Sequence, residues 1–359
     1  MPHRFHHVTP KSPGPCSARR LAPAILFCFL LAQVACTTES SQPIFELSGM
    51  AMGTSYSVKL VGPVPQTEQR AIARDVSMQL EHIDALMSTW RPDSELSLFN
   101  ASTSTDWFAI SDDTHAVMDA ALSVGRLTDG AFDVTVGPLV DLWGFGPQSS
   151  PAEPPSQQQI DALRQRTGIE LLALQSEPPA LRKTRQEVSV DLSGIAKGYA
   201  VDRLATVLDA RNIEHYLVEI GGELRARGLN ARGERWTIAV ERPAANQRSV
   251  HRLIRISNAA VATSGNYRNY FEHAGTRYAH TLDPRTGSPV THTLASVTVV
   301  GASAMLADAL ATGLTVLGPV DGFNLAVREE LAALFISRTD GGFTERSTPS
   351  LHRLLAGAP

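Results

Sequence analysis

The stretch Val188-Ser-Val-Asp-Leu-Ser-Gly-Ile-Ala-Lys-Gly-Tyr-Ala-Val-Asp202 predicts a strand, a tight turn and a helix. Its first residues alternate between apolar and polar, as in a half-buried strand. Asp191 and Ser193 are of the kind that cap helices. A helix start has free N–H groups and a partial positive charge, so it favours anions such as phosphate. Lys197, one turn inside, would add a full charge; an ordinary capped helix is the alternative interpretation.

Composition limits the class of protein. The chain has 359 residues, 43% of them hydrophobic, and a net charge of −4. This is enough to bury a sizeable core, in one large domain or two intimate ones. No basic run is present, which argues against nucleic acid as a partner. The three cysteines are Cys16, Cys28 and Cys36, so residues 37–359 can form neither an internal disulfide nor a thiolate metal site.

The N-terminus has the pattern of an export signal. Arg19 and Arg20 precede an apolar run over residues 21–35 that ends in small residues and Cys36. Residues 33–36 resemble a lipoprotein box, although Gln33 stands where leucine is usual. We expect a signal peptide over residues 1–36, a tether over 37–43, and a lipid anchor at Cys36 on the periplasmic side of a bacterial inner membrane. Plain secretion and an uncleaved anchor are the alternatives.

The rest of the chain predicts an α+β fold with mainly antiparallel sheets flanked by helices. We expect a domain over residues 44–340 and a C-terminal tail over 341–359. Gly221 and Gly222 predict a hairpin turn between two strands. The remaining elements follow from apolar periodicity. Helices are expected over residues 66–87, 111–124, 132–143, 160–167 and 302–317. Strands are expected over residues 45–60 with a bend, and over 216–220, 223–228, 236–240, 250–256, 296–300 and 332–337, with 236–240 and 250–256 extending the same sheet.

Asp308 and Thr312 are the first candidates for chemistry. They lie four residues apart on a predicted helix, so both side chains point the same way. A carboxylate and a hydroxyl on one face offer hard oxygens of the kind that Mg²⁺ prefers. The alternative is that Asp308 caps a helix or pairs with a distant arginine.

Three further segments combine polar residues with turn signals. His280 has apolar neighbours and precedes an Asp-Pro turn, and a satisfied, partly buried histidine is its alternative interpretation. Residues 128–134 have Asp-Gly turn chemistry before a predicted helix, or form a simple loop. Trp90 lies beside a capping stretch, with packing against the core as its alternative.

Taken together and in order, these motifs resemble the ApbE family of FAD:protein FMN transferases. The resemblance covers roughly residues 45–335. It is carried by Met52-Gly-Thr, Met87-Ser-Thr-Trp-Arg-Pro-Asp-Ser-Glu95, Thr128-Asp-Gly-Ala-Phe-Asp133, Asp191-Leu-Ser-Gly-Ile-Ala-Lys-Gly-Tyr199, Glu219-Ile-Gly-Gly222, Thr263-Ser-Gly265, His280-Thr-Leu-Asp-Pro-Arg-Thr-Gly287 and Ala307-Asp-Ala-Leu-Ala-Thr312. The resemblance implies an α+β fold that holds FAD in a cleft, with Mg²⁺ at its pyrophosphate.

The resemblance also implies roles for individual residues. Gly194, through its carbonyl, Asp308 and Thr312 would bind Mg²⁺. His280 is the candidate general base, with an aspartate as its rival. The expected contacts to FAD are Met52, Trp90, Ala131, Phe132, Asp133, Asp191, Lys197 and Leu282.

The implied reaction is the transfer of FMN from FAD to a threonine of an acceptor protein, with release of AMP. The family's acceptors are membrane redox subunits, such as those of sodium-pumping quinone reductase and related electron-transport complexes. Two other functions stay open on the residues. One is a Mg²⁺-dependent FAD pyrophosphatase, in which water replaces the threonine. The other is an exported FAD-binding carrier without turnover.

Overall fold

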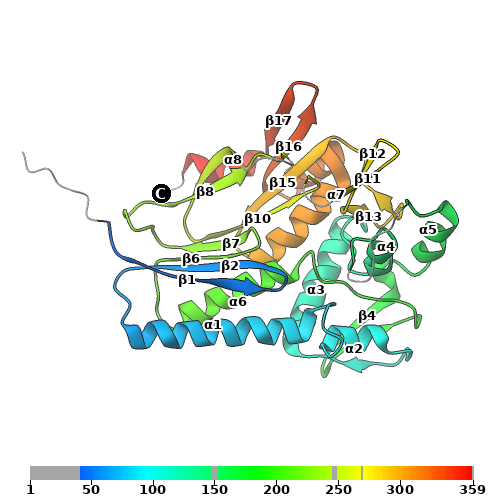
Figure 1. Ribbon diagram of the computed structural model, residues 1–359, viewed down its shortest axis with the longest axis horizontal. Helices are drawn as coiled ribbons and strands as arrows, with labels where there is room; N and C mark the ends of the chain where they lie inside the picture. Colours follow the sequence, from blue (N-terminus) through cyan, green and yellow to red (C-terminus); the bar gives the residue numbers. More distant parts are fainter. Residues whose placement is uncertain (1–40, 147–152, 245–248, 268–269, 358–359) are drawn as a thin grey trace, which may run out of the picture. The chain divides into compact units, whose positions relative to one another are not determined.

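The computed structural model describes residues 41–146, 153–244, 249–267 and 270–357 (Figure 1). The expected signal peptide, Cys36 and most of the tether lie outside these residues. An eight-stranded sheet is the centre of the fold, and all its neighbouring strands are antiparallel. Its strands, in spatial order, are β1 (Ile44–Ala51), β2 (Thr54–Val61), β6 (Tyr216–Ile220), β7 (Glu223–Arg227), β10 (Ala259–Gly265), β15 (Leu294–Gly301), β16 (Ala332–Thr339) and β17 (Gly342–Ser347). The expected α+β class is therefore confirmed.

Helices cover one face of this sheet. Figure 1 shows α1 (Gln66–Met87), α6 (Ala196–Asp209) and α7 (Ala304–Arg328) on the same side of the strands, with α3 (Asp112–Leu127) beside α7. Their apolar faces and one face of the strands form the main core. The predicted helix 66–87 is confirmed, because its periodic apolar residues are those that are buried. These are Ile72, Val76, Leu80, Ile83 and Met87.

The other face is covered by β8 (Trp236–Glu241), β9 (Val250–Ile256) and α8 (Pro349–Ala356). The prediction that 236–240 and 250–256 extend the main sheet is wrong, since β8 and β9 form a separate two-stranded sheet. Trp236 and Ile238 alternate with exposed residues, and this apolar face packs against buried residues of the main sheet. The tail boundary at 341 is also wrong. β17 pairs with β16, and Leu351 of α8 is buried in the same core.

Shorter elements complete the fold on the side of α3 and α4. A three-stranded sheet has the order β3 (Phe108–Ala109), β5 (Pro179–Lys183) and β4 (Leu172–Ser176). The short 3-10 helix η1 (Ile169–Leu171) comes directly before β4 in the chain. The helices are α2 (Glu95–Ala101), α4 (Gly137–Leu142) and α5 (Gln157–Arg164). Two small hairpins pair β11 (Tyr270–His273) with β12 (Thr276–Ala279) and β13 (Leu282–Asp283) with β14 (Ser288–Pro289).

Two helix boundaries differ from expectation. The helix predicted over 132–143 begins only at Gly137, because the Asp133 carboxylate accepts hydrogen bonds from the Thr135 N–H and hydroxyl and offers the backbone an alternative to the helix. Pro138 then sits in the first turn, where proline is tolerated. The helix predicted over 160–167 spans Gln157–Arg164, because Ser156 at the N-cap and Gln159 in the first turn form a capping box.

The stretch Val188-Ser-Val-Asp191 is not a strand, contrary to expectation. Its backbone bonds to side chains instead. Asn100 donates from Nδ2 to the Val190 carbonyl at 2.8 Å and accepts from the Val190 N–H at 2.8 Å. Buried Lys183 donates to the carbonyls of Phe99, Asn100 and Val188. Both side chains therefore fix the segment that leads into the predicted turn.

Helices α6 and α7 cap each other with carboxylates. Asp202 of α6 accepts from the Ala304 and Met305 N–H groups at the start of α7, each at 3.1 Å. Asp308 of α7 accepts from the Gly198 N–H in the first turn of α6 at 3.1 Å. Gly198 permits this packing, because a Cβ there would lie 2.3 Å from the Ala304 carbonyl oxygen. Asp191 and Ser193 do not cap α6, whose N-cap position is Ile195 without a side-chain bond.

Helix α7 is the only described helix long and apolar enough to cross a membrane by length and composition. Much of it is buried, and it carries Asp308 against the start of α6. It is kinked at Gly318, with Pro319 next in the chain. These features are those of the core helix of a folded domain.

Candidate active site

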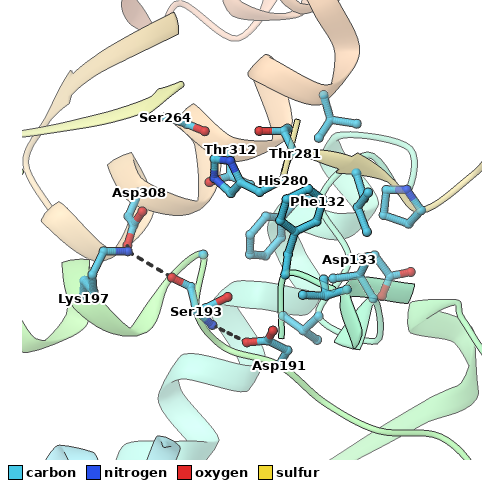
Figure 2. A pocket seen from close by; sticks show the side chains of 18 of the residues that line it. Phe132, Asp133, Asp191, Ser193, Lys197, Ser264, His280, Thr281, Asp308 and Thr312 are labelled. Carbon is cyan, nitrogen blue, oxygen red and sulfur yellow. Dashed lines mark hydrogen bonds and ion pairs between the residues drawn. The ribbon is translucent and has the colours of Figure 1, made fainter. Parts of the chain in front are cut away.

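One cavity of about 600 Å³ collects almost all of the predicted site residues. Its walls come from the loop before α4, the start of α6, the end of β10, the segment around β13, and α7 (Figure 2). The residues that line it and that the sequence predicted are Trp90, Ala131, Phe132, Asp133, Asp191, Gly194, Lys197, His280, Leu282, Asp308 and Thr312.

Met52 is the predicted residue that is not among those lining the cavity. It lies between β1 and β2 with a φ of 51°, in the left-handed region, and packs partly against the main core. Thr54, two residues on, is close to Gly221, whose Cβ, if present, would lie 2.9 Å from the Thr54 methyl. The β1–β2 hairpin therefore lies next to the cavity wall at Gly221.

Three residues that could supply oxygen ligands, Gly194, Asp308 and Thr312, line the cavity where α7 faces the turn before α6. Asp308 and Thr312 lie one helical turn apart on α7, as predicted. A Cβ on Gly194 would lie 3.6 Å from the Thr312 hydroxyl oxygen, so the glycine backbone and the threonine are neighbours. No group of three His, Cys, Asp or Glu side chains that could hold a metal occurs among the described residues. A metal here would therefore need the carboxylate, hydroxyl and carbonyl together.

Lys197 brings the positive charge of the cavity. Its Nζ donates to the Ser193 carbonyl at 3.1 Å and lies 3.9 Å from an oxygen of Asp308 and 3.9 Å from an oxygen of Glu223 (Figure 2 shows the first bond). Burial lowers the pKa of Lys197, but attraction to Asp308, Glu223 and Asp191 outweighs it and holds the pKa above its ordinary value. Lys197 is therefore charged at neutral pH.

Asp308 caps α6, as its alternative interpretation allowed, but its ion-pair partner is Lys197 and not an arginine. It also lines the cavity. Burial raises the pKa of its carboxyl above the ordinary value, against the opposing effects of Lys197 and the Gly198 N–H. A cation bound nearby would stabilise the ionised form of the Asp308 carboxyl.

Two further acidic residues of the cavity, Asp191 and Asp133, have internal partners. The Asp191 carboxylate accepts from the Ser193 N–H at 2.8 Å, and its own N–H donates to the Val134 carbonyl at 2.7 Å. Asp133 bonds to Thr135, and burial raises the pKa of its carboxyl. Asp191 therefore shapes the turn before α6, and Asp133 shapes the loop before α4.

His280 and Trp90 are far apart in the sequence, and both line the cavity. His280 follows β12 and makes an edge contact with Phe145, with ring centroids 6.3 Å apart. The Trp90 side chain is not packed in the core, since the residue is 71% exposed. Trp90 therefore lines the cavity as an exposed aromatic residue.

Glu223 is the residue that sequence reasoning missed. It lines the cavity but is only 4% exposed. Burial raises the pKa of its carboxyl to about 8, while Lys197 opposes this and Asp308 adds to it. The signal in the sequence was an acidic residue between the Gly221-Gly222 turn and the apolar Leu224, at the start of a predicted strand.

Comparisons with known proteins agree on one family. A sequence model of the ApbE family matches residues 52–335. The FAD:protein FMN transferase of Vibrio cholerae is 46% identical over 310 residues, which are 86% of this chain and 92% of the relative. That of Escherichia coli is 39% identical over 311 residues, 86% of this chain and 88% of the relative.

Solved structures give the same result. The flavin transferase ApbE from Vibrio cholerae has a TM-score of 0.81 and 44% identity, covering 88% of this chain and 100% of the other. The apo form of the flavinyl transferase ApbE from Pseudomonas stutzeri has a TM-score of 0.80 and 38% identity, and the match covers 89% of this chain and 99% of the other.

Proposed function

We propose that this chain, which belongs to the ApbE family and is an FAD:protein FMN transferase, uses Mg²⁺ and modifies a threonine of its acceptor. The relatives that it resembles over most of their length are named for this transfer. The observation that supports the proposal is one cavity that Lys197, His280, Gly194, Asp308 and Thr312 all line. A pyrophosphate needs neutralising charge on its oxygens, and this cavity offers it.

The donors at Asp308, Thr312 and the Gly194 carbonyl fit Mg²⁺, since all three are hard oxygens. The remaining positions would be left for phosphate oxygens and water, as is usual for this ion. When bound, Mg²⁺ would neutralise charge on the pyrophosphate and its leaving group. Lys197, with two of its three protons not engaged in a hydrogen bond among the described residues, would donate to the same phosphate oxygens.

In the proposed reaction the threonine oxygen forms a bond to the FMN-side phosphorus and the bond between the two phosphates breaks. AMP leaves with the bridging oxygen, and FMN stays on the protein as a phosphoester. The hydroxyl proton passes to a base, because a hydroxyl is a poor nucleophile at neutral pH. His280 is the candidate for that base, and an aspartate of the cavity is its rival.

The acceptor would enter beside small residues. Gly221, Thr263, Ser264 and Gly265 line the cavity, and a Cβ on Gly222 would meet no atom within 4 Å. This leaves room for a threonine-bearing segment of a membrane redox subunit, such as one of a quinone reductase or another electron-transport complex. We also propose that Cys36 is lipidated and anchors the enzyme on the periplasmic side of the inner membrane, where such subunits are reached.

Incubation of the full chain with FAD, Mg²⁺ and an acceptor domain tests the proposal. Covalent flavin on the acceptor threonine, absent from an acceptor with alanine there, would support it. Rapid release of FMN and AMP without acceptor would favour the pyrophosphatase instead. Bound FAD that persists unchanged would favour the carrier.

A further inference from the structure

Glu223 is a buried carboxyl with spare hydrogen-bonding capacity. It is the first residue of β7, directly after the Gly221-Gly222 turn. Its Oε1 lies 3.9 Å from the Lys197 ammonium, too far for a direct hydrogen bond. Its Oε2 is buried and has no hydrogen-bond partner among the described residues. A buried acceptor of this kind carries an energetic cost unless a donor reaches it. The Glu223 carboxyl can therefore accept a hydrogen bond from a donor that moves toward it when the occupancy of the cavity changes.

Lys197 lies between two carboxyls. Asp308 of α7 and Glu223 of β7 are each 3.9 Å from its Nζ, and the Ser193 carbonyl is its direct acceptor. Asp308 also belongs to the oxygen set that fits Mg²⁺. A cation on Asp308 would remove the negative charge that attracts Lys197 from that side and would repel the ammonium.

We infer that Glu223 is a positioning residue that becomes the principal partner of Lys197 when a divalent cation occupies Asp308. Its role is to keep the ammonium inside the cavity beside the cation, aimed at the phosphate oxygens. The inference rests on the proposed function in one respect, namely the use of Mg²⁺ at Asp308.

Electrostatics favour this exchange of partners. One oxygen of Glu223 and one oxygen of Asp308 each lie 3.9 Å from the Lys197 ammonium. A cation that neutralises Asp308 therefore leaves Glu223 as the carboxyl that attracts this ammonium. The two oxygens of Glu223 then supply the acceptors that Asp308 no longer offers.

The kinetic test is Glu223→Gln, which keeps the shape and removes the charge. Glu219→Gln is the matched control, because Glu219 lies on the same hairpin but accepts from the Gly222 N–H at 2.8 Å and does not line the cavity. We expect Glu223→Gln to lower kcat for FMN transfer by about 10- to 100-fold, the scale of a misplaced catalytic group. The acceptor KM should stay unchanged, and Glu219→Gln should behave like the wild type.

A double-mutant cycle tests whether Glu223 acts through Lys197. If it does, Glu223→Gln should have no further effect in a Lys197→Met background. An equal loss in both backgrounds would overturn the inference, since Glu223 would then act independently.

A spectroscopic readout does not depend on turnover. The lysines of the chain are Lys11, Lys59, Lys183 and Lys197, so ¹⁵N-lysine labelling of the full protein gives few ammonium signals. We expect the Lys197 signal to persist on addition of Mg²⁺ alone in the wild type and in Glu219→Gln. In Glu223→Gln, Mg²⁺ should abolish it. Lys183, which bonds to three carbonyls, is the internal reference.

A Lys197 signal that survives Mg²⁺ equally well in Glu223→Gln would overturn the inference. If that variant does not fold, Glu223→Asp retracts the charge by one methylene, and an unchanged Mg²⁺ response there would overturn it equally. A wild type that shows the expected signals but transfers no FMN would refute the proposed function and leave the inference intact.

Discussion

Replacement of Asn100 by alanine should destabilise the protein through a backbone segment ninety residues away. The Asn100 amide makes two hydrogen bonds of 2.8 Å to the N–H and carbonyl of Val190, which is fully buried. Without the amide, both backbone groups lose their partners. Each unsatisfied buried group costs about 1–3 kcal/mol, so loss of both partners in Asn100→Ala should lower the free energy of unfolding by about 2–6 kcal/mol.

Urea unfolding of the full chain measures this change. Leu98→Ala on the same helix is the control, because Leu98 is 52% exposed, and it should stay within about 0.5 kcal/mol of the wild type. The affinity for FAD should also fall in Asn100→Ala, since Asp191 directly follows Val190. A free energy of unfolding within 0.5 kcal/mol of the wild type would refute the reasoning, because it would mean that water or another group replaces Asn100 without cost.

Three further predictions concern charge and anchoring. Asp308→Asn keeps the acceptor for the Gly198 N–H but loses the charge, so the protein should fold while Mg²⁺-dependent turnover falls at least about 100-fold; full activity would contradict the metal assignment. Burial raises the pKa of Asp113, but hydrogen bonds from Tyr199 and His82 outweigh it and hold the pKa below its ordinary value. Asp113→Asn should therefore cost about 1–3 kcal/mol at pH 7. This difference from the wild type should shrink as the pH falls below about 4 and through the folded pKa; a difference that grows in acid would contradict it. Cys36→Ser should release a soluble form or leave an unprocessed precursor in cell fractionation, and a wild type without any lipid label would exclude the anchor.

The parts of the fold set by local periodicity could be predicted from the sequence. The helix over 66–87 has an apolar residue at nearly every turn, and packing against the sheet follows that stripe. The Gly221-Gly222 hairpin follows from two glycines with positive φ between alternating strands. Asp308 and Thr312 could be paired because helical spacing alone puts them on one face.

Features that depend on distant partners could not be predicted in this way. The segment at Val190 alternates like a strand, but Asn100 occupies its hydrogen bonds, and nothing local indicates that. The strands β8 and β9 alternate like members of the main sheet, and only their packing shows that they lie over it. Glu223 becomes notable only once its burial beside Lys197 is known.

The intact mass of an acceptor protein tests the central claim most directly. The full chain is incubated with FAD, Mg²⁺ and an acceptor that carries a threonine, and the acceptor mass and AMP are followed together. We predict that the acceptor gains one esterified FMN for each AMP released, and that its Thr→Ala variant gains none. FMN released into solution faster than it is attached, or a label that survives loss of the threonine, would contradict the account.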